Sequence, residues 1–402
     1  MTHALACTLS NERRLIRPFL KWLRVREIPH LKRIQLGIQQ SPGSDAISEK
    51  ESKEGLPDMC FFDEDGWAVL IESKIQAKIS IAQLRRHSKT AERYGYEQAT
   101  VAVLSVDPPR RALPKEIRCV QWKEVYSWFT KRAENSVWSQ HFVNYMEVFE
   151  AKMLSQDYGI RGTLTMFDGF KFSDKDPYTY SEGKRLIRLL GEELRKDKQL
   201  TRQLGLDPKG KGRGAITRGE DGNVWDFIPL VEARNAKLFT DYPHATMGIH
   251  PMWTTVAVTI PNGVKGRLKG RLKEIGHDGF EDLLSGIERR LRKVLLTVPS
   301  SQPMLYLVQR HYPSQRSSPV VDGRIDVDLR TMLESSEIVL KHQPMWRGSI
   351  YDIITHKRTN IQWGIDVRYP HNDKIMRSRK ALETISKTWI AMKPLVDFAT
   401  EG

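Results

Sequence analysis

Two apolar segments separated by a short polar turn form the clearest pattern in the chain. Residues 56–62 read Leu-Pro-Asp-Met-Cys-Phe-Phe, residues 67–74 read Trp-Ala-Val-Leu-Ile-Glu-Ser-Lys, and an Asp-Gly pair closes the segment between them. This arrangement predicts a β-hairpin. Folding the chain there returns Asp58 to the level of Glu72. Because strand side chains alternate, Glu72 and Lys74 leave the same face of the sheet.

Helical spacing of apolar residues is found on both sides of the hairpin. The stripe from Leu15 to Leu23 predicts an amphipathic helix from about Asn11 to Leu23, with Pro18 tolerated in or near its first turn. A second helix is expected to begin near Ser80, a plausible N-cap. Apolar runs at residues 99–106 and 117–122 predict further strands.

The second half of the chain mixes helices with strands. Apolar runs at 253–260 and 304–308 predict strands, and spacings of four, four and three from Val264 to Ile275 predict a helix that ends near Gly276. We expect an α/β protein with a domain over residues 1–150. A basic α+β domain over 151–402 follows, with DNA binding, sensing or oligomerisation as candidate roles.

Composition limits the class of protein. The 402 residues are 40% hydrophobic, enough for two folded domains, and the formal net charge of +15 favours polyanionic partners such as nucleic acid. The three cysteines are far apart, which suggests neither a zinc ribbon nor a disulfide framework. Charged residues precede the first apolar run, and no apolar stretch reaches bilayer length. A soluble cytoplasmic protein without membrane contact is therefore expected.

The hairpin also brings ionisable side chains close together. Two neighbouring carboxylates, Asp58 and Glu72, suit a hard divalent cation such as Mg²⁺, and Lys74 beside them can orient water or hold phosphate. The Glu-x-Lys pattern alone is common in this chain, whereas only Glu72 follows directly on an apolar strand. The alternative is a surface hairpin with an ordinary salt bridge. The other matches are Glu51-Ser52-Lys53, Glu150-Ala151-Lys152, Glu182-Gly183-Lys184 and Asp207-Pro208-Lys209.

Pro57-Asp58 followed by Glu72-Ser73-Lys74 resembles the PD-(D/E)xK motif of the restriction-endonuclease-like nuclease superfamily. The order of elements, α-β-β-β-α-β, is similar to the core of that superfamily. The resemblance covers residues 8–135, about a third of the chain. It implies a mixed central sheet flanked by helices in the N-terminal domain.

The resemblance also implies roles for individual residues. Asp58, Glu72 and the backbone carbonyl of Ser73 would bind Mg²⁺, for which Mn²⁺ can substitute in such sites. Lys74 would position water and stabilise charge on the phosphate. Gln83 occupies the position of a glutamine that often faces the metal. Glu12 matches a first-helix metal ligand by position only, and a carboxylate that stabilises a helix N-terminus is the alternative.

Basic residues supply candidate nucleic-acid contacts in three places. Arg85 and Arg86 follow the motif, a glycine-interleaved loop carries cations at 209, 211 and 213, and the helix expected before Gly276 carries four more. Solvated surface cations are the alternative in each place. The residues of the second and third groups are Lys209, Lys211, Arg213, Lys265, Arg267, Lys269 and Arg271.

Together these features predict a Mg²⁺-dependent deoxyribonuclease, an endonuclease rather than an exonuclease. Prokaryotic restriction or phage defence is its setting by analogy. DNA is the expected partner, and a homodimer or a defence-system protein is a further candidate partner. Two alternatives remain open at this point. One is a non-catalytic nucleic-acid-binding protein. The other is a sensor or interaction protein whose nuclease domain is activated by a partner or ligand.

Overall fold

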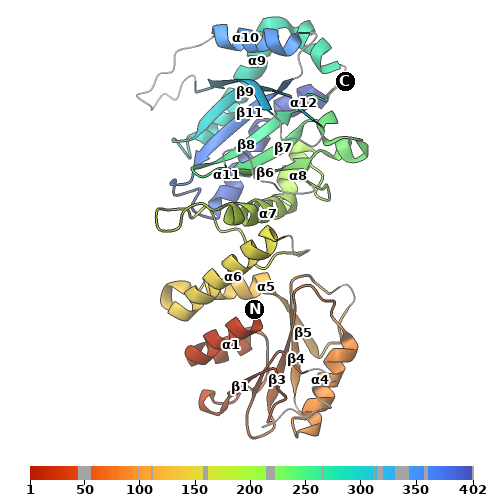
Figure 1. The fold of residues 1–402 in the computed structure, drawn as a ribbon, viewed down its shortest axis with the longest axis vertical. Helices are drawn as coiled ribbons and strands as arrows, with labels where there is room; N and C mark the ends of the chain where they lie inside the picture. The colour runs from red at the N-terminus through yellow and green to blue at the C-terminus, as the bar shows by residue number, and fades with distance from the viewer. Residues whose placement is uncertain are drawn as a thin grey trace. The chain divides into compact units, whose positions relative to one another are not determined.

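The computed structural model divides the chain into two compact units, Met1–Met166 and Phe167–Gly402 (Figure 1). Residue 150, where the sequence suggested a boundary, lies inside helix α6 (Val137–Ser155). Each unit has its own sheet and its own apolar core. The structure describes residues 1–43, 56–97, 99–109, 112–156, 162–213, 222–264, 267–311, 313–314, 320–330, 344–356 and 361–400.

The first unit is built on a mixed five-stranded sheet in the order β1-β2-β3-β4-β5. The first three strands pair antiparallel, and β3, β4 and β5 pair parallel. The expected hairpin is confirmed as β2–β3, with Gly66 at a φ of +86° in its turn. The strands are β1 (Gln35–Ile38), β2 (Met59–Phe62), β3 (Ala68–Lys74), β4 (Thr100–Ser105) and β5 (Ile117–Gln121).

The single helix expected from Asn11 to Leu23 is wrong. Helix α1 ends at Asn11, Glu12 leaves helical geometry at φ −126° and ψ 67°, and the chain restarts through a 3-10 turn into α2. Pro18 explains the restart, because a proline fits a first helical turn but clashes with the preceding turn in a helix interior. The segments are α1 (Thr2–Asn11), η1 (Arg13–Leu15) and α2 (Ile16–Trp22).

Helices cover both faces of this sheet, with α4 on one side and α1, α5 and α6 on the other (Figure 1). On β3, Val69 and Ile71 pack into the core beneath α1, α2, α5 and α6, while Leu70 packs with Leu84 of α4. Glu72 continues the alternation and therefore faces α4. The remaining helical segments are η2 (Leu31–Arg33), α4 (Ile81–Arg93), α5 (Trp122–Thr130), η3 (Ala133–Asn135) and α6.

The second unit contains an antiparallel six-stranded sheet in the order β10-β9-β11-β8-β7-β6. The strands predicted at 253–260 and 304–308 are confirmed within β8 and β9, respectively. One apolar core joins the sheet to its helices. The strands are β6 (Val224–Pro229), β7 (His244–Ile249), β8 (Trp253–Ile260), β9 (Gln302–His311), β10 (Val320–Asp328) and β11 (Ile361–Pro370).

The helix expected before Gly276 is present, and it breaks at that glycine. Gly276 adopts φ 65° and ψ −169°, which interrupts α9 before a second helical segment continues. Among the described helices of the whole chain, none combines the length and the apolar character that a bilayer crossing requires. The helical segments of this unit are α7 (Tyr180–Lys196), α8 (Lys198–Leu204), η4 (Val231–Asn235), η5 (Phe239–Asp241), α9 (Arg267–Leu295), α10 (Pro344–Thr355), α11 (Lys380–Ala391) and α12 (Lys393–Thr400).

Candidate active site at the end of strand β3

The hairpin register brings the two acidic residues of the motif to the same level. Met59 pairs with Ile71, so that Asp58 and Glu72 occupy the next positions of the two strands. The Ser73 backbone N–H donates to Oδ2 of Asp58 at 2.7 Å. This hydrogen bond fixes the Asp58 carboxylate beside the end of β3, as the sequence predicted.

Two polar side chains, those of Lys74 and Gln83, meet at one oxygen of Glu72. The Lys74 ammonium donates to Glu72 Oε1 at 2.6 Å, and the Gln83 amide donates to the same oxygen at 2.8 Å. Lys74 also donates to Oε1 of Gln83, at 2.9 Å. Lys74, Gln83 and Glu72 therefore form a closed triangle between β3 and α4.

The local sequence explains why α4 directs Gln83 and His87 toward β3. Ser80 caps the helix by accepting from the Gln83 backbone N–H at 3.3 Å, as expected for a serine N-cap. Leu84, His87 and Ala91 are buried at three- and four-residue intervals. Gln83 and His87 are four residues apart, so both project toward β3 from successive turns.

His87 holds the second oxygen of Glu72. Its Nε2 lies 3.0 Å from Glu72 Oε2, and the two residues are 2% and 4% exposed. Sequence analysis gave His87 no role, although a four-residue spacing puts it on the same side of a helix as Gln83. Its spacing from Gln83 was the available signal, but its partner became apparent only once α4 was packed on the sheet.

The two carboxylates have opposite electrostatic environments. Burial acts to raise the pKa of Glu72, but hydrogen bonds from His87 and Lys74 outweigh it, and the pKa is lowered overall. Burial raises the pKa of Asp58, and the negative charge of Glu72 adds to that effect. A cation beside both groups would relieve the cost of ionising Asp58.

The donor set at this point suits a hard cation. Asp58 and Glu72 offer carboxylate oxygens. The Lys74 carbonyl accepts from the backbone N–H of Val106, the residue that directly follows β4. Because successive carbonyls of a strand point to opposite sides, the Ser73 carbonyl points to the side of Asp58. Mg²⁺ commonly takes one or two carboxylates and completes its shell with water and phosphate. The described residues contain no group of three or more His, Cys, Asp or Glu side chains placed to hold a metal ion. Asp58, Glu72 and the Ser73 carbonyl are thus the oxygen donors at this point, and water or phosphate would have to complete the shell of any Mg²⁺ held there.

Glu12 is engaged elsewhere in the first unit. Its Oε2 accepts from the Ser136 hydroxyl at 2.5 Å, and its Oε1 accepts from Arg14 Nε at 2.6 Å. Ser136 is the N-cap of α6, so the Glu12 carboxylate links the break after α1 to that helix. We therefore leave Glu12 out of the proposed metal ligands.

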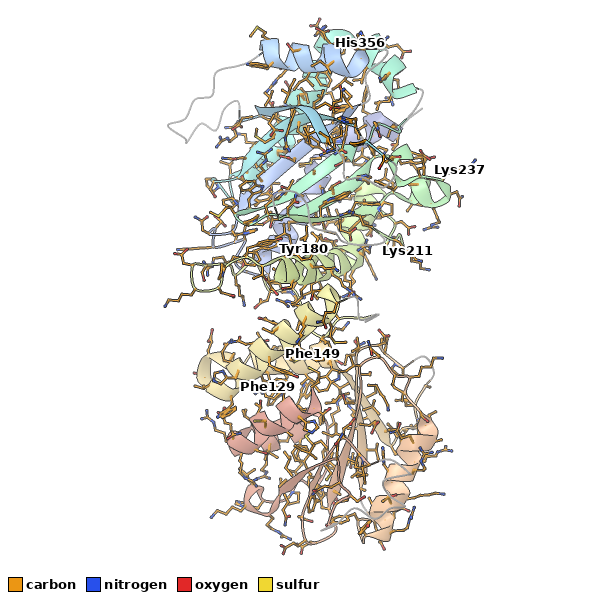
Figure 2. All side chains as sticks on the ribbon, in the orientation of Figure 1. Phe129, Phe149, Tyr180, Lys211, Lys237 and His356 are labelled. Carbon is orange, nitrogen blue, oxygen red and sulfur yellow. The ribbon has the colours of Figure 1, made fainter. Side chains whose placement is uncertain are left out.

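The cationic loop at residues 209–213 packs on its own unit. The Arg213 backbone N–H donates to buried Asp226 Oδ1 at 2.7 Å, and the guanidinium lies 4.0 Å from the Trp225 ring centre. A Cβ added at Gly212 would come within 2.1 Å of the same oxygen. Lys209 and Lys211 are exposed, and Lys211 is labelled in Figure 2. The glycine therefore permits close packing on Asp226, and the two lysines remain available to an anion.

The cations at the start of α9 make contacts within the second unit. Arg271 donates to the Phe398 carbonyl at 2.6 Å and lies over the Phe398 ring, while Lys269 donates to the His356 carbonyl at 3.1 Å. These contacts give both cations a structural role. Lys265 and the side chain of Arg267 lie outside the described residues. On α4 of the first unit, Arg85 and Arg86 are exposed.

Comparisons with protein-family models, curated proteins and solved structures found no match to this chain. A functional assignment therefore depends on the chemistry at the end of β3.

Proposed function

We propose that this protein is a metal-dependent nuclease that hydrolyses phosphodiester bonds, with DNA as its preferred substrate. The observation that carries the proposal is the meeting of Asp58, Glu72, Lys74 and Gln83 at the end of β3. The element order α2-β1-β2-β3-α4-β4 also supports it, because it matches the α-β-β-β-α-β order of the resemblance to the PD-(D/E)xK nucleases.

The acidic residues would hold the cation. Asp58, Glu72 and the Ser73 carbonyl would bind Mg²⁺, which when bound polarises a phosphate and lowers the pKa of a coordinated water. Glu72 is ionised at neutral pH, because its hydrogen bonds lower its pKa. His87 and Gln83 orient that carboxylate through separate oxygens.

Lys74 would act on the substrate rather than on the metal. Its ammonium is held by Glu72 and Gln83 and is about one-eighth exposed. A fixed cation beside the scissile phosphate stabilises the charge that develops on its oxygens. Because an ordinary lysine is protonated at neutral pH, we assign Lys74 electrostatic stabilisation before any role as general base.

The net charge supports a polyanionic substrate. With 64 Lys and Arg against 49 Asp and Glu, the chain carries a formal charge of +15. Exposed Arg85 and Arg86 lie on α4, the helix that also carries Gln83 and His87. Contacts of this kind bind phosphates without reading sequence, so binding should weaken with added salt.

Cleavage of supercoiled plasmid and linear duplex with Mg²⁺ tests the proposal. Asp58→Asn and Lys74→Met should each lower the cleavage rate at least about a hundredfold, the scale of losing a charge-stabilising group. Glu64→Gln and Lys78→Met are matched controls, because both residues are exposed and lie outside the network. Equal cleavage by all the variants would mean that the activity does not reside at this site. Single-stranded DNA and RNA in parallel reactions identify the preferred substrate.

A second candidate function is nucleic-acid binding without cleavage. The observation that favours it is that both oxygens of Glu72 already have protein partners. Such a network would make the end of β3 a scaffold that fixes α4 on the sheet. Tight, salt-sensitive DNA binding with no cleavage under Mg²⁺ or Mn²⁺ would support this candidate over the nuclease.

A further inference from the structure

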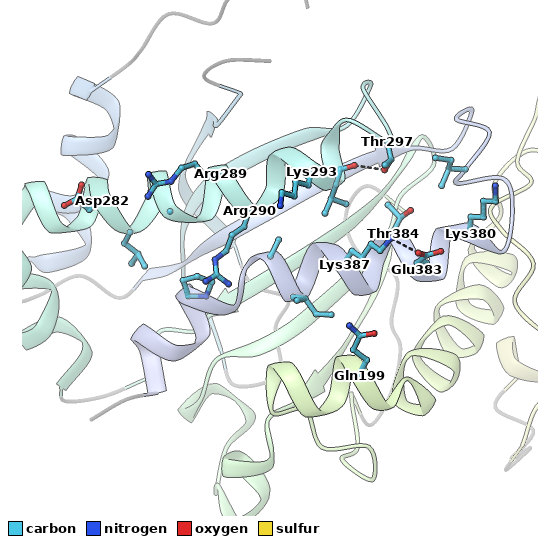
Figure 3. Close-up of a pocket in the computed structure, with 17 residues that line it drawn as sticks. Gln199, Asp282, Arg289, Arg290, Lys293, Thr297, Lys380, Glu383, Thr384 and Lys387 are labelled. Carbon is cyan, nitrogen blue, oxygen red and sulfur yellow. Dashed lines mark hydrogen bonds and ion pairs between the residues drawn. The ribbon is translucent and has the colours of Figure 1, made fainter. Parts of the chain in front are cut away.

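An open groove runs between α9 and α11 of the second unit, with a volume of about 1040 Å³ (Figure 3). Its walls are the second segment of α9 and the whole of α11, and Gln199 of α8 reaches it from below. None of the residues at the end of β3 contributes to it. The groove therefore concerns a property separate from the proposed cleavage.

Basic side chains outnumber acidic ones along the groove. Five cations line it against two carboxylates, Asp282 and Glu383, which leaves a balance of 5 − 2 = +3. Lys387 pairs with Glu383 at 2.6 Å, but both side chains are mostly exposed. Within the part of the chain that the structure describes, the other four cations form no salt bridge. The five cations are Arg289, Arg290 and Lys293 of α9, and Lys380 and Lys387 of α11.

The floor between these cations is apolar. Leu283 and Val294 come from α9, and Ile390 and Ala391 come from α11. Leu283 and Ile390 are half-buried and so keep apolar surface open to a partner. No residue of the lining is aromatic, so the groove offers no ring on which a nucleic-acid base could stack. An apolar floor with cationic rims instead matches the core and rim of a protein interface.

The length of the groove fits a helix. Its α9 wall runs from Asp282 to Val294, and its α11 wall from Lys380 to Ala391. At 1.5 Å per residue each wall is roughly 17 to 18 Å long, about three helical turns. We propose that this groove docks an acidic amphipathic helix of a partner protein. The apolar stripe of that helix would lie on the floor, and its Asp and Glu side chains would face Arg290, Lys293 and Lys380.

Gly286 gives direct access to the middle of the groove. It lines the α9 wall, and a Cβ added there would meet no atom within 4 Å. A larger side chain at this position fills the space that a docked helix would need. The first carbon of that side chain disturbs no existing contact. Alanine-like residues also favour a helix over glycine by about 0.5 to 1 kcal/mol. Gly286→Leu is therefore a blocking variant that should fold normally.

A synthetic peptide of about 14 residues, with leucines at helical i, i+3, i+4, i+7 spacing and glutamates on both flanks, is the probe. Its binding to the full chain is followed by fluorescence anisotropy. A scrambled peptide of identical composition removes the stripe, and a version with lysine in place of glutamate reverses the charge. The protein variants are Gly286→Leu, the pair Arg290→Glu with Lys293→Glu, and Lys237→Glu as a cation control outside the groove.

The proposal expects the striped acidic peptide to bind, with at least about tenfold weaker binding by the scrambled and basic peptides. Gly286→Leu and the double charge reversal should each weaken it by about the same factor, and Lys237→Glu should leave it unchanged. Absence of binding to the striped peptide would overturn the proposal. Equal binding of the scrambled peptide would also overturn it, because charge alone would then be sufficient. So would groove variants that bind like the wild type, or a duplex DNA probe that binds here in place of the peptide.

Discussion

His87 Nε2 lies 3.0 Å from Glu72 Oε2, so that the second turn of α4 covers the buried Glu72 carboxylate of β3. Removing the imidazole leaves that oxygen desolvated without a partner. We expect His87→Ala to lower the free energy of unfolding by about 1.5 to 3 kcal/mol, the range for hydrogen bonds to charged groups. His87→Gln, which can place an amide N–H near the same point, should recover part of the loss. Urea titrations followed by circular dichroism would check both values, and a His87→Ala protein as stable as the wild type would contradict the role given to this contact.

Variants of the Glu72–Lys74 pair can distinguish an effect on stability from an effect on cleavage. The two side chains are 5% and 12% exposed, so removing either charge leaves the other in a poorly solvated place. Glu72→Gln and Lys74→Met should each cost about 3 to 5 kcal/mol, and the double variant should cost less than their sum. Cleavage should be lost in all three proteins. Unfolding free energies and cleavage rates measured on the same preparations test this, and a double variant that regained cleavage would show that neither charge is needed for the reaction.

Asp366 on β11 should make the stability of the second unit depend on pH. Burial raises its pKa to about 7, and its nearest cation, Arg368 Nε, lies 3.6 Å away. Arg368 donates to Asp326 instead, at 2.9 Å. An aspartate in the unfolded chain has a pKa of about 3.9, so the folded state holds this proton more tightly. The stabilising contribution is therefore complete below about pH 4 and is lost as pH rises through about 7.

Between about pH 4 and pH 8, this group should lower the free energy of unfolding by a few kcal/mol. Asp366→Asn should remove that part of the decline, because an amide does not titrate. Exposed Asp282, changed to Asn, is the matched control and should leave the profile as it is. Urea titrations at a series of pH values measure the effect. Parallel profiles for the wild type and Asp366→Asn would refute it.

Gly212 should tolerate no side chain, in contrast to Gly286. An added Cβ at Gly212 would lie 2.1 Å from Asp226 Oδ1, an oxygen that also accepts the backbone N–H groups of Arg213 and Phe227. Gly212→Ala should therefore destabilise the second unit by about 1 to 3 kcal/mol. Gly286→Ala should leave stability unchanged or raise it by up to about 1 kcal/mol. Differential scanning calorimetry on both variants tests the contrast, and a similar melting temperature for the two would count against it.

Features that depend on neighbours in the chain were predictable. The β2–β3 hairpin follows from its apolar runs and the Asp-Gly turn, and the start of α4 follows from Ser80. The break at Gly276 was predictable for the same reason, because glycine alone readily takes that backbone conformation. The element order α-β-β-β-α-β required a third strand before α4, but no residues were assigned to it. That strand is β1, whose four residues carry little periodicity and are held by pairing with β2.

Contacts between distant residues were not predictable. Glu12 was assigned to a metal site on position alone, but its partner Ser136 is 124 residues away in the sequence. Arg271 was expected to contact phosphate. Its guanidinium instead donates to the carbonyl of Phe398, a residue 127 positions away in the sequence. Composition shows that a cationic side chain is present. Only the packing of the fold decides whether that side chain already contacts a backbone carbonyl or an aromatic ring.

Residue order alone places Glu72 and Lys74 on one face of a strand and brings Asp58 back beside them. Strand alternation and a two-strand turn are local geometry, and they follow from residue order. The side chains that contact these three residues depend instead on how the elements pack in the folded protein. The docking of α4 on the sheet brings Gln83 and His87 to the two oxygens of Glu72, and the packing of α11 beside α9 leaves a cationic groove between them. Both depend on which buried faces fit together, which is a property of the whole fold rather than of any segment.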